Sequence, residues 1–80
     1  MKTEKIIPYG KIADMAVLGQ LIRAHRKQQG VTQAQLSMFA GVSPKFISEL
    51  ENGKTTAEIG KTLRVLQYLG LDLKVTPRGF

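Results

Sequence analysis

The fold is decided by residues 32–53, which read TQAQLSMFAGVSPKFISELENG. Thr32, with a glutamine three residues later, forms a capping box and predicts the start of a short helix. Gly41 predicts the end of that helix, because glycine takes the left-handed conformation of a helix C-terminus without steric penalty. Ser43 and Pro44 predict a second helix, since serine is a favourable N-cap and proline at the first helical position loses no hydrogen bond. This stretch therefore encodes two short helices separated by a tight turn.

The spacing of small and apolar residues in this stretch is that of a helix-turn-helix. Counting from Gln33, the small Ser37 is the fifth residue, where the two helices must cross closely, and Gly41 is the ninth, in the turn. Four apolar residues occupy the positions that must point inward: Leu36, Val42, Ile47 and Leu50. In this motif the second helix enters the major groove of DNA. The spacing therefore predicts a DNA-reading helix pair.

A longer helix is predicted before this pair. Asp14 is a suitable N-cap, and Gly30 predicts an end near Gln29. Residues three and four apart form one largely apolar face: Met15, Leu18, Leu21, Ile22 and His25. This periodicity predicts a helix packed against the pair.

A fourth helix is predicted after the pair. Thr55 and Glu58 form a second capping box, and Gly70 predicts an end near Leu69. Its expected buried stripe consists of Ile59, Leu63, Leu66 and Leu69. With the preceding three helices this gives an all-α domain.

The tail changes period. Residues 71–76 alternate apolar and polar side chains, which predicts a half-buried strand ended by Pro77. A lone strand leaves its backbone groups unpaired, so we expect it to pair with the same strand of a second copy about a two-fold axis. The expected dimerisation residues are Leu71, Leu73 and Val75. Pairing with Ile6 and Ile7 of the same chain is the alternative. The expected parts of the chain are a basic, flexible arm at 1–13, the DNA-binding domain at 14–69 and the dimerisation strand and tail at 70–80.

The charge pattern favours a nucleic-acid partner. Twelve Lys and Arg against six Asp and Glu give a net charge of +6. Residues 1–31 carry +4 and residues 54–80 carry +3, whereas residues 32–53 carry −1. A nearly neutral reading element between basic flanks suits DNA, where the flanks bind phosphates and the centre reads bases.

Composition argues against other classes of protein. The chain has no cysteine and a single histidine, His25, so it lacks the further histidines or cysteines of a zinc-type metal site and a nucleophile–base–orienter set, and we expect no metal and no cofactor. We therefore expect no enzyme activity. The longest apolar run is too short to span a membrane, and no targeting segment is evident, so a cytoplasmic protein is expected.

The motifs together resemble a known family. The matching residues are Leu18-Gly19, Ile22-Arg23, Arg26, Gly30, Thr32-Gln33, Leu36, Gly41-Val42-Ser43, Ile47-Ser48 and Glu51-Asn52-Gly53. Over about residues 14–69 this pattern resembles the lambda-repressor-like (Xre) helix-turn-helix family. The stretch 66–75, LQYLGLDLKV, resembles the HipB-type antitoxin branch. The resemblance implies a bundle of four to five helices, a terminal strand shared across a homodimer, and a HipA-like kinase toxin as partner.

The expected DNA-binding residues lie on and around the second helix of the motif. They are Gln33, Ser43, Pro44, Lys45, Phe46, Ser48, Glu49, Asn52, Lys54 and Lys61. Lys45 can donate to guanine, and Glu49 can accept from cytosine. Pro44 departs from the polar residue that the family often has here, which removes an adenine contact. Phe46 either touches a thymine methyl or sugar-phosphate edge, or is a partly buried packing residue. Asn52, Lys54 and Lys61 are expected to contact the DNA backbone, and each of these two lysines can equally be a solvated surface charge.

Arg26 and Glu51 are interpreted differently from the surface charges. The resemblance implies an ion pair between the first and third helices, with a structural role. It also implies that Gln33 braces the recognition helix besides lying at a helix N-terminus suited to phosphate.

The resemblance thus implies a homodimeric transcriptional repressor that binds an inverted-repeat operator and serves as the antitoxin of a kinase toxin. Two alternatives stay open. One is a stand-alone phage-type repressor without a toxin, and the other is a protein-interaction module built on the same fold.

Overall fold

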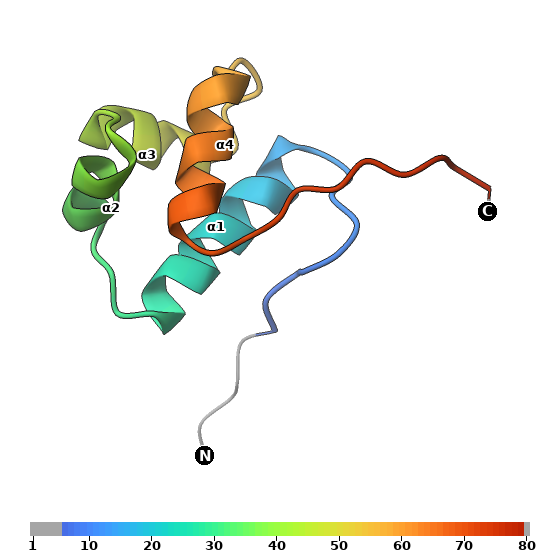
Figure 1. Ribbon diagram of the computed structural model, residues 1–80, viewed down its shortest axis with the longest axis horizontal. Helices are drawn as coiled ribbons and strands as arrows, with labels where there is room; N and C mark the ends of the chain where they lie inside the picture. The colour runs from blue at the N-terminus through green and yellow to red at the C-terminus, as the bar shows by residue number, and fades with distance from the viewer. Residues whose placement is uncertain (1–5, 80) are drawn as a thin grey trace.

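The computed structural model describes residues 6–79, and this part of the chain folds as four helices. They are α1 (Met15–Gln28), α2 (Gln33–Ala40), α3 (Pro44–Glu51) and α4 (Ile59–Tyr68). In Figure 1, α2 and α3 lie to one side of α4, and α1 lies behind it. The fold is the expected all-α helix-turn-helix bundle. Within residues 6–79 no helix is both long enough and apolar enough to cross a membrane.

The helix ends of the central motif are those that the sequence predicts. Thr32 accepts a hydrogen bond from the backbone of Gln35, whose side chain accepts one from the Thr32 backbone, at 3.0 and 2.9 Å. Gly41 ends α2 at φ +68°. The Ser43 hydroxyl accepts from the Phe46 amide at 3.0 Å and so caps α3. Local chemistry alone therefore fixes where these two short helices begin and where α2 ends.

The fourth helix differs from the prediction in its start. It begins at Ile59, with Glu58 as the N-cap accepting from the Gly60 amide. Thr55 lies in a turn before it and does not cap the helix. Since the Glu58 side chain is already used as the cap, the capping box expected between Thr55 and Glu58 is not formed.

The expected buried stripe of α4 is also partly wrong. Ile59 and Leu63 are 62% and 41% exposed, whereas Leu66 and Leu69 are buried as expected. The buried face is Thr62, Val65, Leu66 and Leu69, a regular spacing of three and four. Thr62 can be buried because its hydroxyl donates to the Glu58 carbonyl at 2.9 Å. A polar residue with a local hydrogen bond therefore occupies a core position.

The core joins all four helices. Its buried apolar members are Leu18, Ile22, Leu36, Ala40, Ile47, Leu50, Val65, Leu66 and Leu69. Helices α1 and α3 approach closely at Gly19, where an added Cβ would lie 2.5 Å from the carbonyl oxygen of Leu50 and 2.7 Å from that of Glu51. This position has no space for a side chain, so a glycine sets the distance between the helix that anchors the fold and the helix that carries the predicted binding face.

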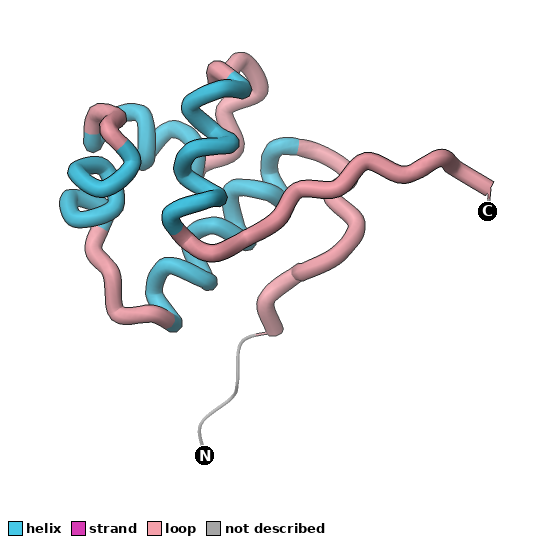
Figure 2. Tube along the Cα trace, viewed as in Figure 1, coloured by secondary structure: helices cyan, strands magenta, loops and turns pink. Residues whose placement is uncertain are grey.

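The tail is extended but unpaired in the part of the chain that the structure describes. Residues 71–77 form an extended loop and no strand (Figure 2). Every residue from Asp72 to Gly79 is exposed. The predicted strand is therefore not formed within one chain, and its pairing with a second copy stays a prediction.

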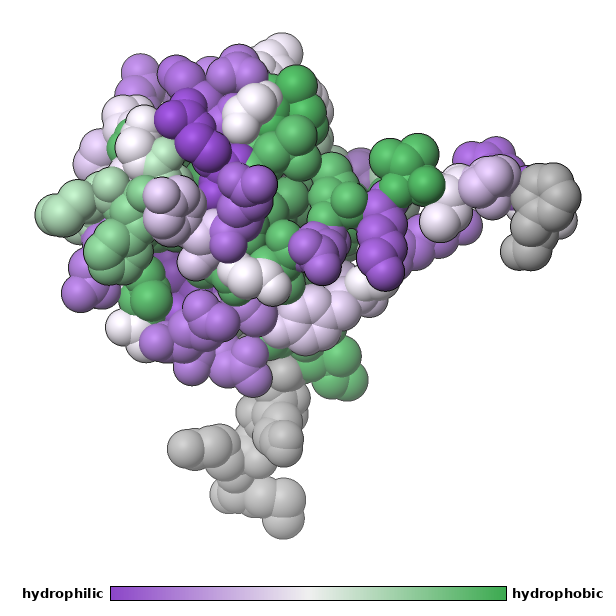
Figure 3. Space-filling view, in the orientation of Figure 1, coloured by the Kyte–Doolittle hydropathy of each residue, from purple (hydrophilic) through white to green (hydrophobic). Residues whose placement is uncertain are grey.

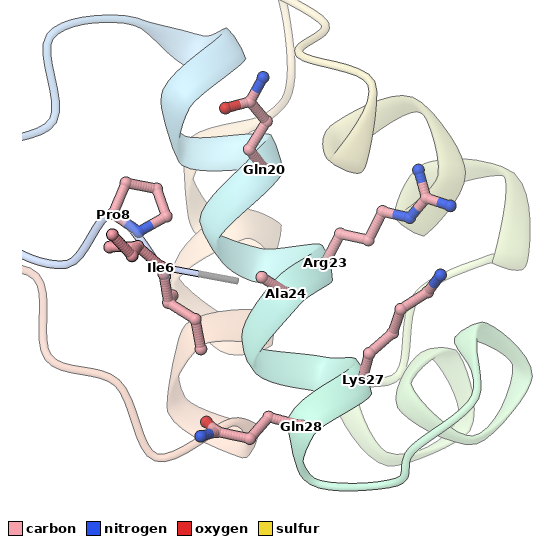
Figure 4. A pocket seen from close by; sticks show the side chains of 8 residues that line it. Ile6, Pro8, Gln20, Arg23, Ala24, Lys27 and Gln28 are labelled. Carbon is pink, nitrogen blue, oxygen red and sulfur yellow. The ribbon is translucent and has the colours of Figure 1, made fainter. Parts of the chain in front are cut away.

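The arm does not supply the alternative partner for the tail. Ile6 and Pro8 lie beside α1, where with Ala24, Arg23 and Lys27 they line a shallow pocket (Figure 4). Residues 9–12 run beside the tail and, with it, border a groove of about 770 Å³ that also includes Leu18, Leu21 and Leu66. Residues 1–5 of the predicted arm and Phe80 lie outside the described residues.

Candidate nucleic-acid interface

Helix α3 has one buried and one outward face. Ile47 and Leu50 are fully buried, as predicted for the inward positions. Ser43, Pro44 and Lys45 are exposed at the start of the helix. Ser48 and Glu49 are half-buried and complete the set of residues singled out for base contacts, apart from Phe46. The start of α3 therefore offers a polar surface of the kind that reads base edges in a major groove.

Two basic side chains near this face differ in their partners. Lys54 pairs with Glu49, its Nζ lying 3.2 Å from Oε1, with side-chain exposures of 47% and 36%. Lys45 makes no ion pair with any described residue. An exposed pair contributes only about 0.2–1 kcal/mol to stability. Lys45 is therefore the cation of α3 that is fully available to a partner.

Phe46 lies between the binding face and the core. It is half-buried and packs against the core cluster, as the packing interpretation expects, and its contact with DNA stays a prediction. The Nζ atom of Lys61, on α4, lies 5.8 Å from the centre of its ring. The sequence predicts a DNA contact for each of these residues separately, and no local pattern signals their interaction because it joins α3 to α4.

Asn52 lies at the C-terminal end of α3. Its side-chain amide donates to the Ser48 carbonyl at 2.8 Å, and its backbone caps the helix. The exposed side chain borders the same surface as Lys54.

Arg26 belongs to a buried cluster on the inner side of α3. Its Nε and Nη2 atoms donate to the two carboxylate oxygens of Glu51 at 2.6 and 3.0 Å, and Nη1 donates to the Val31 carbonyl at 2.8 Å. The two side chains are only 7% and 2% exposed. The ion pair implied by the family resemblance is therefore present between α1 and α3, and Arg26 serves structure rather than an outer surface.

Gln33 joins this cluster from the start of α2. Its Nε2 donates to Oε1 of Glu51 at 3.0 Å, so it braces α3 as the resemblance implies. The side chain is half-buried at the first position of α2. Gln33 therefore connects the first turn of α2 to α3. A helix N-terminus such as that of α2 favours anion binding.

His25 has a structural partner that the sequence did not reveal. Because the Leu69 carbonyl oxygen can only accept, the His25 Nε2 at 2.8 Å donates to it. The Nδ1 atom lies 2.5 Å from the Tyr9 hydroxyl oxygen, and the two rings meet edge to face. His25 therefore joins the arm to the end of α4. Within residues 6–79 no group of three or more potential metal ligands occurs.

Comparison with known proteins finds several relatives of this chain. Residues 19–75 match the family of helix-turn-helix domains. The uncharacterised HTH-type transcriptional regulator y4mF of Sinorhizobium fredii is 45% identical over 69 residues, covering 86% of this chain and 91% of that protein.

Two solved structures share the architecture. One is described as "HipB-O4 20mer complex" and matches with a TM-score of 0.80 and 25% identity, covering 89% of this chain and 100% of that one. The other is described as "Structure of HipA-HipB-O2-O3 complex" and gives the same TM-score, identity and coverages.

Proposed function

The chain belongs to the helix-turn-helix family of transcriptional regulators and resembles HipB. We propose that it is an Xre-type homodimeric repressor, which binds an inverted-repeat operator. The observation that carries the proposal is the outward face of α3. There the exposed Lys45 forms no ion pair with a described residue and lies beside the exposed Ser43, while Ile47 and Leu50 fix the helix to the core.

Base readout in this proposal comes from the start of α3. Lys45 donates to O6 and N7 of guanine, and the hydroxyls of Ser43 and Ser48 accept or donate as the base requires. Glu49 accepts from cytosine N4 when it leaves Lys54. Pro44 contributes shape and no hydrogen bond, since proline has no backbone N–H.

Phosphate contacts flank this readout. The N-terminus of α2 presents Gln33, and a helix N-terminus is a favourable arrangement for an anion because its dipole is positive there. On the other side of α3, Asn52, Lys54 and Lys61 are exposed and suit the sugar-phosphate backbone.

Dimerisation is proposed through the tail. Leu71, Leu73 and Val75 alternate along the extended segment, and Val75 is 94% exposed in a single chain. Apolar surface beside α4 continues toward this tail in Figure 3. Antiparallel pairing of two tails would satisfy their backbone groups and cover this surface. The dimer would then present two α3 helices to half-sites about one helical turn apart.

A kinase toxin of the HipA type is the proposed protein partner. The support is the likeness of this chain to a protein solved in a complex described as HipA-HipB-O2-O3. The test is whether a HipA-like kinase encoded beside the gene co-purifies with this chain when both are expressed together. A kinase neighbour that fails to bind, or its absence, would favour a stand-alone repressor.

The DNA-binding proposal is tested with the DNA segment upstream of the gene. We expect tight binding to one palindromic segment, a salt-dependent affinity, and loss of preference at particular bases in Lys45→Ala. Lys11→Ala is the matched control, because it removes one exposed positive charge from the arm. Equal binding to that segment and to an unrelated duplex would overturn sequence-specific repression and favour the interaction module.

A further inference from the structure

Lys61 is the one lysine that the structure places against an aromatic ring within residues 6–79. It lies in the first turn of α4, and its Nζ is 5.8 Å from the ring centre of Phe46, in the first turn of α3. It makes no ion pair with a described residue. The interaction thus brings a cation from a different helix to the side of the proposed reading helix.

The group that a lysine contacts in the protein determines how readily its ammonium can bind a phosphate. Lys54 faces the carboxylate of Glu49, which neutralises it, and that pair must open before the ammonium can meet a phosphate fully. An aromatic face attracts a cation through its quadrupole but carries no net charge. Lys61 therefore keeps its whole positive charge while its position is restricted.

Restriction matters because ordering a long side chain on binding costs free energy, about 0.5–1.5 kcal/mol for a rotamer-rich side chain. Phe46 is itself fixed, since it packs against the core and its backbone amide donates to the Ser43 cap. A cation held by a fixed ring loses less freedom when it binds a phosphate than a solvated lysine does.

We propose that Phe46 is a positioning residue for DNA binding, which holds the Lys61 ammonium beside the recognition helix so that it meets a phosphate at the wall of the groove that α3 enters. This inference rests on the proposed function. It assigns Phe46 an effect on the salt-dependent part of the affinity and no role in base preference.

The experiment is a pair of double-mutant cycles on a duplex that the wild-type protein selects from a randomised pool. Phe46→Leu keeps apolar bulk and removes the ring, and we expect it to weaken binding about two- to fivefold per half-site. Phe46→Tyr keeps the ring face and should retain the wild-type affinity. In a Lys61→Gln background the leucine substitution should have no further effect.

Lys54→Gln provides the matched control, because Lys54 lies on the same surface but pairs with Glu49 and not with the ring. In the Lys54→Gln background, Phe46→Leu should weaken DNA binding as much as it does in the wild-type protein. Lys61→Gln should also lower the slope of log affinity against log salt by about one per subunit, the change for one phosphate contact. Lys61 is exposed, so this variant folds even if Phe46→Leu does not.

Several results would overturn the inference. Additive effects of Phe46→Leu and Lys61→Gln would show that the ring does not act through the lysine, and an unchanged salt slope in Lys61→Gln would remove the phosphate contact. Replacing operator thymines by deoxyuridine removes their methyl groups and tests whether Phe46 contacts one. If this replacement weakens binding of the wild-type protein but not of Phe46→Leu, Phe46 reads thymine directly.

The two proposals fail in different ways. If the wild-type protein selects no duplex from the pool, sequence-specific binding fails and this inference falls with it. If the wild type selects a duplex but the cycle is additive, only this inference fails. Ring-current shifts of the Lys61 ε-methylene protons, measured without DNA, should appear in the wild type and vanish in Phe46→Leu. Their absence in the wild type would overturn the geometry directly.

Discussion

The two sides of α3 carry the same kinds of charged group in opposite circumstances. On the inner side, Arg26 and Glu51 are nearly inaccessible and their oxygen and nitrogen atoms have protein partners. On the outer side, Glu49 and Lys54 form a longer, exposed pair at 3.2 Å. The inner pair fixes the position of α3, and the outer charges are available to a partner. Burial, more than residue type, therefore separates the structural charges from the proposed binding charges.

The largest effect is expected on the inner side. Arg26→Ala leaves Glu51 as a buried unpaired charge and should lower the free energy of unfolding by about 3–5 kcal/mol. Thermal or urea unfolding followed by circular dichroism measures this. Arg23→Ala, an exposed arginine on the same helix, should leave the unfolding midpoint nearly unchanged. A small effect of Arg26→Ala would mean that solvent reaches Glu51 and that the two sides are not distinct.

The crossing of α1 and α3 comes next. Gly19→Ala places a Cβ against the Leu50 and Glu51 carbonyls, and we expect a loss of about 1–3 kcal/mol in the free energy of unfolding despite the better helix propensity of alanine. The exposed neighbour Gln20→Ala is the control and should not destabilise. A stable Gly19→Ala variant would show that α3 can shift outward without cost.

The outer side should respond in binding and not in stability. Lys45→Ala should leave the free energy of unfolding within about 0.5 kcal/mol of wild type, because the side chain is exposed and forms no ion pair with residues 6–79. Its affinity for the selected duplex should fall by about 1–3 kcal/mol, with relaxed preference at one base pair. Fluorescence anisotropy against single-base variants of the duplex measures both. A large drop in unfolding midpoint would instead assign Lys45 to the fold.

The smallest effect is expected for the exposed pair. Glu49→Gln should change the free energy of unfolding by about 1 kcal/mol or less, since a solvent-exposed ion pair contributes little. The comparison with Arg26→Ala, measured under identical salt conditions, is the direct test of the contrast between the two sides. Similar losses in both variants would contradict it.

The fold was predictable where local interactions decide it. The Asp14, Thr32 and Ser43 caps and the inward Leu36, Ile47 and Leu50 follow from residues a few positions apart, and all are observed. The buried face of α4 was predicted less well. The exposed Ile59 and Leu63 fit the spacing of a buried apolar stripe just as well as the residues that are in fact buried. Only packing against the rest of the bundle, mainly α2, distinguishes the two.

The candidate site divides in the same way. Its residue types, and the turn that presents them, were available from the spacing between Gln33 and Asn52. The spacing did not reveal which of these side chains are hydrogen-bonded to another helix, which form ion pairs and which are available to a partner. The Arg26–Glu51 pair was anticipated only through resemblance to a family, since its members are 25 positions apart and nothing local links them.

By itself the sequence determined the helices, their caps and the helix-turn-helix, because these depend on interactions over three to five residues and on one left-handed glycine in the turn. The tertiary structure decided which face of α4 is buried, how closely α1 approaches α3 at Gly19, and that Lys61 lies over Phe46. These features join residues distant in the chain. Their energies arise from burial and close contact, which exist only once the helices have packed.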